Sequence, residues 1–246
     1  MSVALPAALA DIAVTEARGP GRPLVVIDPG HGGRDPGATG ADGRLREKEL
    51  TLLVARELRA RLAQAGRVRV ALTRDGDDSL ELDTRGEIAR RLGADLFVSL
   101  HADSARVAGA RGATVYSLSE VASDADAARL AAAAGTPVTS AAEGSVRALL
   151  ADLAMRESME GSADFAVRLL GRAGDGVEWR PEPHRFAAFR VLRRAEAPAV
   201  LFEMGYLSSV DDEARLRDPV RRAQMVEALA GAIETEMALR RPRRGA

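Results

Sequence analysis

Residues 24–40 read LVVIDPGHGGRDPGATG, which combines a predicted strand with a glycine-rich loop. Its four leading apolar residues end at Asp28 and Pro29, a pattern typical of a short buried strand. His31 follows in a loop that has glycine at positions 30, 32, 33, 37 and 40. Only three histidines occur among the 246 residues, so a histidine directly after a predicted strand is a candidate functional group.

The composition limits the classes of protein to which the chain can belong. A length of 246 residues, 46% of them hydrophobic and only 3% aromatic, allows one large domain with an aliphatic core. The formal net charge of −1 gives no electrostatic basis for binding nucleic acid. No run of about 18 apolar residues predicts a transmembrane helix. The absence of cysteine excludes disulfides, thiol nucleophiles and thiolate-bound zinc.

Strand and helix patterns alternate along the sequence. Apolar or alternating runs predict strands over 24–27, 67–72, 96–100, 113–118, 189–192 and 199–202. Apolar residues at helical spacing predict helices over 47–65, 80–92 and 219–239. This alternation predicts an α/β fold: a single domain over residues 23–240, with a mainly parallel twisted sheet and helices on both faces. Residues 1–22 are expected to be a partly disordered lead-in, and residues 241–246 a basic tail.

Residues 119–161 interrupt the alternation. An alanine-rich helical run is followed by a polar linker, TPVTSAAEGS, and a second helical pattern, VRALLADLAMRESME. The pattern predicts a helical insertion between strand-forming units, because connections of this length are usually functional or disordered. An ordinary helical crossover between two strands explains it equally well.

Three acid–base or metal-binding side chains follow predicted strands. His31 comes after the strand 24–27, His101 after 96–100, and Glu203 after 199–202. The carboxyl ends of parallel strands meet at one edge of a sheet, where Glu47, at the start of a helix, could join them. Two imidazoles and a carboxylate can bind zinc with an open position, and a further carboxylate can act as general base. Taken singly, each residue has an ordinary alternative: a turn histidine, a core histidine, a helix-capping acid or a salt-bridged glutamate.

Five blocks of the sequence resemble those of the zinc-dependent N-acetylmuramoyl-L-alanine amidases, in the same order. The resemblance covers residues 23–235, and its blocks are DPGHGGRDPGATG, REK, VALTRDGDD with TRGEIA, ADLFVSLHAD, and AVLFEMGYLSS. It implies that residues 23–240 form a catalytic domain that cleaves the amide between N-acetylmuramic acid and L-alanine of the peptidoglycan stem peptide.

The same resemblance assigns roles to individual residues. It implies one Zn²⁺ per chain, bound by His31, Glu47 and His101, with Glu203 as the catalytic base. Glu49 is the competing candidate for the third ligand. Glu47 is preferred because it stands between Arg46 and Lys48 at the start of a helix, as in the family pattern.

The insertion resembles, more narrowly, that of the cell-division amidases of Gram-negative bacteria. This implies that residues 119–161 are a regulatory insert that blocks the zinc site until a LytM-domain activator protein displaces it. The acids Glu120 and Glu143 are the autoinhibitory candidates, and Asp124 and Asp126 are nearby. The implied setting is periplasmic peptidoglycan remodelling during daughter-cell separation, by a monomer whose export signal is not in this sequence.

Two arginines and the third histidine of the chain have less specific expectations, and two other functions are alternatives to the amidase activity. Arg74 and Arg85 are expected to be buried and paired with Asp or Glu, and His184 either contacts substrate or is simply exposed. Another zinc hydrolase, such as a carboxypeptidase, would be expected to carry a His-x-x-Glu pair, whereas Gly-Gly-Arg follows His31. A non-catalytic wall-binding relative would be expected to have lost a ligand or the base.

Overall fold

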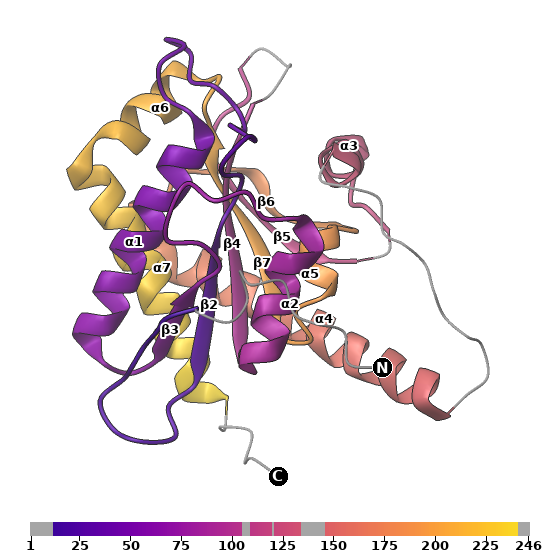
Figure 1. Cartoon of the computed structure of the whole chain (residues 1–246). Coiled ribbons are helices and arrows are strands. Elements are labelled where there is room, and N and C mark those ends of the chain that lie inside the picture. Colours follow the sequence, from indigo (N-terminus) through magenta and orange to yellow (C-terminus); the bar gives the residue numbers. More distant parts are fainter. Residues whose placement is uncertain (1–11, 105–108, 120, 134–145, 241–246) are drawn as a thin grey trace.

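The computed structural model of the protein describes residues 12–104, 109–119, 121–133 and 146–240. Within them, one sheet has the strand order β1-β3-β2-β4-β7-β5-β6 (Figure 1). The strands are β1 (Val14–Thr15), β2 (Leu24–Pro29), β3 (Arg69–Leu72), β4 (Leu96–Asp103), β5 (Ala113–Leu118), β6 (Trp179–Ala187) and β7 (Ala199–Tyr206). Strands β3, β2, β4 and β7 run parallel, whereas β1 and the β5–β6 pair run the other way. The predicted α/β fold with a mainly parallel sheet is therefore confirmed.

Helices cover both faces of this sheet (Figure 1). One face carries α1 (Glu47–Ala65), α7 (Pro219–Leu239) and the C-terminal half of α4 (Val146–Ala173), and the other carries α2 (Leu82–Leu92), α3 (Ala125–Ala133) and α5 (Arg190–Arg193). A 3₁₀ turn (Gly174–Gly176) follows α4, and α6 (Val210–Arg217) follows β7. Val25 and Ile27 of β2 enter one core, while Leu24 and Val26 enter the other. Burial on both sides explains why this strand is a continuous apolar run.

Helix α1 spans the predicted residues and carries Glu47 at its first position. Leu50, Val54 and Leu58 are buried in the core, which fixes the helix against the sheet. Gly66 ends the helix in the left-handed conformation (φ 67°), and its N–H donates to the carbonyl of Leu62. The start of α1 is thereby held at the edge where β2 and β4 end.

The predicted strand over 189–192 is wrong. Phe189 precedes the short helix α5, and the neighbouring strand is β6, which ends at Ala187. Three buried residues of the apolar run, Phe189, Val191 and Leu192, pack in the core through a helical turn. The strand itself reads WRPEPHRFA, and its polar residues fit an outer position in the sheet.

Helix α4 divides into two parts, and the expected end of the insertion at residue 161 falls inside it. Phe165 and Leu169 in its C-terminal half are fully buried in the core, whereas the side chain of Leu153 is 53% exposed. The C-terminal half therefore belongs to the domain core. Glu120, Glu143, residues 1–11 and the tail 241–246 lie outside the described residues.

The described part of the expected lead-in is structured in one place. Val14 and Thr15 pair antiparallel with Ala71 and Val70 and form the outermost strand on that side of the sheet. Among the described residues, none of the helices is both long and apolar enough to cross a membrane.

Candidate metal centre

The glycine-rich loop after β2 wraps tightly around His31. This residue has a left-handed backbone (φ 61°), a conformation that is costly for a non-glycine residue and that is found disproportionately at functional sites. A Cβ on Gly30 would lie 2.4 Å from the His101 ring, and one on Gly37 would lie 2.6 Å from Glu47 Oε2. Glycine is therefore required at both positions, because the backbone passes directly against the ligand candidates.

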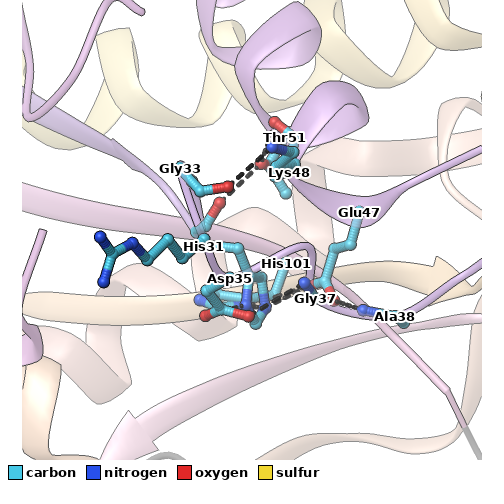
Figure 2. Close-up of polar contacts among 12 residues, drawn as sticks. His31, Gly33, Asp35, Gly37, Ala38, Glu47, Lys48, Thr51 and His101 are labelled. Carbon is cyan, nitrogen blue, oxygen red and sulfur yellow. Dashed lines mark hydrogen bonds and ion pairs between the residues drawn. The ribbon is translucent and has the colours of Figure 1, made fainter. Parts of the chain in front are cut away.

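The loop, α1 and β4 bring His31, Glu47 and His101 together (Figure 2). Glu47 Oε1 lies 3.0 Å from His31 Nε2 and 3.0 Å from His101 Nδ1, and the two ring nitrogens are 3.1 Å apart. The side chain of Glu47 is 4% exposed, while those of His31 and His101 are 22% and 16% exposed. Glu47 thus forms the buried side of the cluster, and the two histidines form the side that is open to solvent.

Outer partners hold these side chains in place. Asp35 Oδ2 lies 2.7 Å from His31 Nδ1, so a proton on Nδ1 leaves the Nε2 lone pair facing the cluster (Figure 2). The backbone N–H of Ala38 donates to Glu47 Oε2 (2.7 Å), and that of Ala102 donates to Glu47 Oε1 (2.9 Å). These bonds make the arrangement a pre-formed site.

The side chains of the cluster shift one another's pKa values, and the shifts keep Glu47 negatively charged. Burial alone would lower the pKa of His31, but hydrogen bonds with Glu47 and Asp35 and their charges raise it above its ordinary value. Burial would likewise raise the pKa of Glu47, yet the two histidines lower it far below its usual range. The carboxylate thus stays ionised and attracts a cation, which is how a metal ligand behaves.

The donor set fits zinc. Two imidazole nitrogens and one carboxylate oxygen, one from each residue, all lie within 4.8 Å of one another. Two His and one Glu with an open side is the ligand set of a catalytic zinc site. Glu49, the competing third ligand, is exposed on α1 and takes no part in this cluster.

Glu203 lies beside this cluster on the next strand. It is the direct Cα partner of His101 in the β4–β7 ladder, and the residue is only 3% exposed. Among the described residues its Oε2 has no hydrogen-bond partner. Burial, and then the charges of Asp103 and Glu47, raise the pKa of Glu203 well above its ordinary value. A carboxyl that binds a proton more tightly than usual suits a general base.

Buried arginines support the loop from behind. Arg85 donates to Asp28 Oδ1 (2.9 Å) and to the carbonyl of His31 (2.6 Å), so its expected pairing with a carboxylate is found. Arg74 differs from expectation, because it donates to the carbonyls of Pro29 and Gly30 rather than to Asp or Glu. Carbonyl oxygens of the turning loop need donors, and a five-donor guanidinium satisfies several of them at once.

His184 is not brought into the cluster. It lies on β6, where its Nε2 is 2.9 Å from Ser117 Oγ and its ring packs 4.5 Å from that of Phe186. Burial lowers its pKa. In contrast, Asp35 contacts His31 although no motif marks it in the sequence; the only signal is its position four residues after His31 in a glycine-rich loop.

Comparison with known proteins gives consistent relatives. The family model for N-acetylmuramoyl-L-alanine amidase matches residues 25–235. AmiC of Escherichia coli O6:H1 is 30% identical over 224 residues, which are 88% of this chain and 54% of AmiC. AmiA of Escherichia coli K12 is 31% identical over 220 residues, which are 87% of this chain and 75% of AmiA. The chain thus spans about half the length of the first relative and three-quarters of the second.

Solved structures agree in fold. The catalytic domain of CwlV, an amidase from Bacillus (Paenibacillus) polymyxa var. colistinus, has a TM-score of 0.64 at 28% identity, covering 89% of this chain and 99% of that one. AmiC2 of Nostoc punctiforme has a TM-score of 0.62 at 33% identity, covering 87% of this chain and 97% of that one. With the family match over residues 25–235, these likenesses show that the chain belongs to the N-acetylmuramoyl-L-alanine amidase family.

Proposed function

We propose that the protein is a zinc-dependent amidase that cleaves the bond between N-acetylmuramic acid and L-alanine in peptidoglycan. The observation that carries this proposal is the cluster of His31, Glu47 and His101, with Glu203 paired directly with His101 in the sheet. Family membership supplies the bond and the substrate class. His31, Glu47 and His101 would hold the zinc ion, and Glu203 would be the catalytic base.

The roles of the protein groups follow from their surroundings. Zinc, when bound, supplies a Lewis acid that makes a water molecule nucleophilic near neutral pH. Glu203 accepts the proton of the attacking water and passes it to the nitrogen of L-alanine as the amide breaks. Asp35 keeps the His31 ring oriented, and Ala38 and Ala102 hold Glu47 through their N–H groups.

The test is product analysis on purified peptidoglycan. The zinc-loaded protein should release stem peptides with a free L-alanine amine and leave the glycan strands intact. Glu203→Gln should lower kcat by at least about 100-fold while the zinc content stays at one per chain. Peptides cut within the stem would instead indicate a carboxypeptidase-like zinc hydrolase. No release with full zinc occupancy, both from the full chain and from the insertion-deletion variant described below, would indicate a non-catalytic wall-binding relative.

The pH dependence of the same reaction tests the base. Because Glu203 acts in its ionised form and its pKa is raised, activity should increase with pH through a pKa above the ordinary glutamate value. An activity that is flat from pH 4 to 7 would contradict this assignment.

We further propose that the insertion restrains this activity in the periplasm until a LytM-domain partner binds, so that cleavage is confined to daughter-cell separation. The support is the narrow resemblance of the insertion and the AmiA and AmiC relatives. Asp124, at the start of α3, pairs with Arg185 of β6 (2.6 Å), which gives the insertion a contact with the domain. The monomeric state stays a prediction.

The deletion that tests this restraint can be designed from the fold. Ser117 is the β-ladder partner of Val200, and Ser162 Oγ accepts from the N–H of Ala199, so the two ends of the insertion meet at the start of β7. Replacing residues 121–158 with a short glycine linker should therefore leave the sheet connected, although it removes Ala127 and Ala131 of α3 from the second core, so the fold of the variant is checked by circular dichroism and thermal unfolding. Basal peptide release should rise. Unchanged release from a folded deletion protein would contradict the restraint.

A further inference from the structure

The rim of the sheet beyond Glu203 carries an arginine with unusual surroundings. Arg180 lies near the start of β6, and its Nη1 donates to the hydroxyl of Tyr206 (2.6 Å) at the end of β7. The guanidinium carbon is 5.9 Å from the centre of the Tyr206 ring. Gly112 lets the backbone of β6 pass close to the residues before β5, because a Cβ there would lie 2.6 Å from the backbone nitrogen of Arg180. Arg180 thus lies beside the start of β5, and its side chain reaches Tyr206 of β7.

Arg180 lacks the acidic partner that other arginines nearby have. Arg185 pairs with Asp124 at 2.6 Å, and Arg111 lies 3.7 Å from Asp211. Within the described parts of the chain, Arg180 forms no ion pair, and only its Nη1 has a hydrogen-bond acceptor. Among the described residues, the Nε–Nη2 edge of the guanidinium has no hydrogen-bond acceptor. This edge matches the two oxygens of a carboxylate.

The position of the base shows which part of a substrate would face Arg180. His31 and His101 lie at the ends of β2 and β4, and Glu203 lies one strand further on, at β7. The leaving amine must be on the Glu203 side, because Glu203 gives it a proton. The peptide attached to that amine therefore extends from β7 toward β5 and β6, and Arg180 faces this path.

Tyr206 lies on the same strand as Glu203 and contacts Arg180. Tyr206 is the ladder partner of Asp103, and the register of the β4–β7 ladder shifts between this pair and the His101–Glu203 pair. Burial raises the pKa of the Tyr206 hydroxyl, while the charge of Arg180 lowers it and those of Asp103 and Glu203 raise it, so all three charged groups are close enough to act on this side chain.

We propose that Arg180, oriented by Tyr206, binds a backbone carboxylate of the stem peptide on the leaving side of the scissile amide. This proposal rests on the proposed amidase function and adds a substrate group that the enzyme recognises. The ligand is a carboxylate presented a few bonds beyond the L-alanine nitrogen. A peptide whose carboxylate is amidated keeps the shape and loses the charge, so the site distinguishes the two forms.

The experiment compares three muramoyl tripeptides, muramoyl-L-alanyl-γ-D-glutamyl-L-lysine and two amides of it. One amide blocks the α-carboxyl of the second residue, and the other blocks the C-terminus. For the zinc-loaded wild-type protein, one of the amides should have a kcat/KM about 10- to 100-fold lower than the free acid, mainly through KM. Which amide is poor identifies the carboxylate that is bound.

The variant Arg180→Met should lose this preference and cleave the acid and the amides equally. The matched control is Arg111→Met, since Arg111 is exposed on the loop before β5 and should leave the preference intact. Tyr206→Phe removes the hydrogen bond that orients Arg180 and should reduce the preference by a smaller factor. An unchanged preference in Arg180→Met, or no preference in the wild type, would overturn the proposal.

A binding measurement separates this proposal from the function on which it rests. The free tripeptide and its two amides are titrated into the wild type and into Arg180→Met, with chemical shifts or heat as readout. Tighter binding of the acid to the wild type alone supports the carboxylate site even if no muramoyl peptide is cleaved, in which case the proposed amidase function fails by itself. Equal binding of acid and amides to both proteins would overturn the site.

Discussion

At the scale of single residues, Asp35 determines how His31 is presented. Its Oδ2 is 2.7 Å from His31 Nδ1, and its Oδ1 accepts from the N–H of Gly37 (3.0 Å). A carboxylate behind a metal-binding histidine fixes the tautomer and the ring orientation. We expect Asp35→Asn to weaken zinc binding about 10- to 100-fold, measured by competition with a chromophoric chelator.

The control for this prediction is Asp78→Asn. Asp78 is an exposed acid on a loop near the same face, and its side chain makes no hydrogen bond with the ligand candidates. Zinc affinity should stay at the wild-type value in this variant. Equal zinc affinity of Asp35→Asn and the wild type would show that Asp35 does not orient the ligand.

Residues differed in how far the sequence could predict them. His31, His101 and Glu203 could be found because each follows an apolar run that is recognisable as a strand. Asp35 could not be placed, because the direction of the loop depends on backbone angles such as the φ of 61° at His31. Arg180 could not be identified from the sequence, because its proposed role depends on a hydrogen bond to Tyr206. The two residues lie on different strands and come together only in the folded sheet.

At the scale of secondary-structure elements, Asp28 joins four of them. Its carboxylate accepts from Thr73 Oγ1 (2.5 Å), Ser99 Oγ (2.7 Å) and Arg85 Nη1 (2.9 Å), which come from the end of β3, from β4 and from α2. The residue is fully buried in β2. Asp28→Asn would leave the Arg85 charge buried without its partner, so the free energy of unfolding should fall by about 3–5 kcal/mol in denaturant titrations.

The pH dependence of this loss has a definite sign. Burial would raise the pKa of Asp28, but Arg85 and the two hydroxyls lower it below its ordinary value. A lowered pKa contributes stability above the unfolded-state value, and this stability disappears as the pH falls through the folded-state value. The difference between the wild type and Asp28→Asn should therefore be constant near neutral pH and shrink below about pH 4. A difference that grows in acid would contradict the assignment.

Two leucines of helix α4 are expected to contribute differently to the stability of the protein. Leu169 is fully buried in the core, whereas Leu153 is 53% exposed. Leu169→Ala should reduce the free energy of unfolding by about 2–5 kcal/mol, because it removes packed side-chain atoms and leaves a cavity. Leu153→Ala should change it by less than about 0.5 kcal/mol. Similar losses at both positions would mean that the whole helix is part of the core.

Helices and strands could be predicted where their own residues carry a clear apolar pattern and recognisable ends. Helix α1 occupies its predicted residues because an acidic start, buried leucines at helical spacing and a closing Gly66 all agree. Strand β6 was missed because WRPEPHRFA is polar and contains two prolines, which an outer strand tolerates. The pattern predicts a strand over 189–192 instead. Four residues with the sequence Phe-Arg-Val-Leu are too few to distinguish a strand from a helical turn by their apolar pattern.

At the scale of the whole molecule, strand order creates the site. β2, β4 and β7 are neighbours, so His31, His101 and Glu203 meet at one edge although they are far apart in the chain. That these residues end parallel strands could be predicted, and their meeting at one edge is a general property of such sheets. The order of the strands could not be derived from the pattern, because it depends on how helices from distant segments pack on both faces.

Zinc should stabilise the whole fold, because the three proposed ligands come from three separate parts of it. The unfolded chain offers no such convergence, so binding adds its free energy to folding, by about 2.7 kcal/mol at a free zinc concentration 100 times the Kd. For a domain of this size that corresponds to a Tm about 5–10 °C higher with zinc than with a chelator. His101→Ala removes one ligand and should abolish the zinc-dependent shift, whereas Glu203→Gln keeps all three ligands and should retain it. A chelator-insensitive Tm in the wild type, or a full zinc shift in His101→Ala, would mean that these residues do not hold the metal.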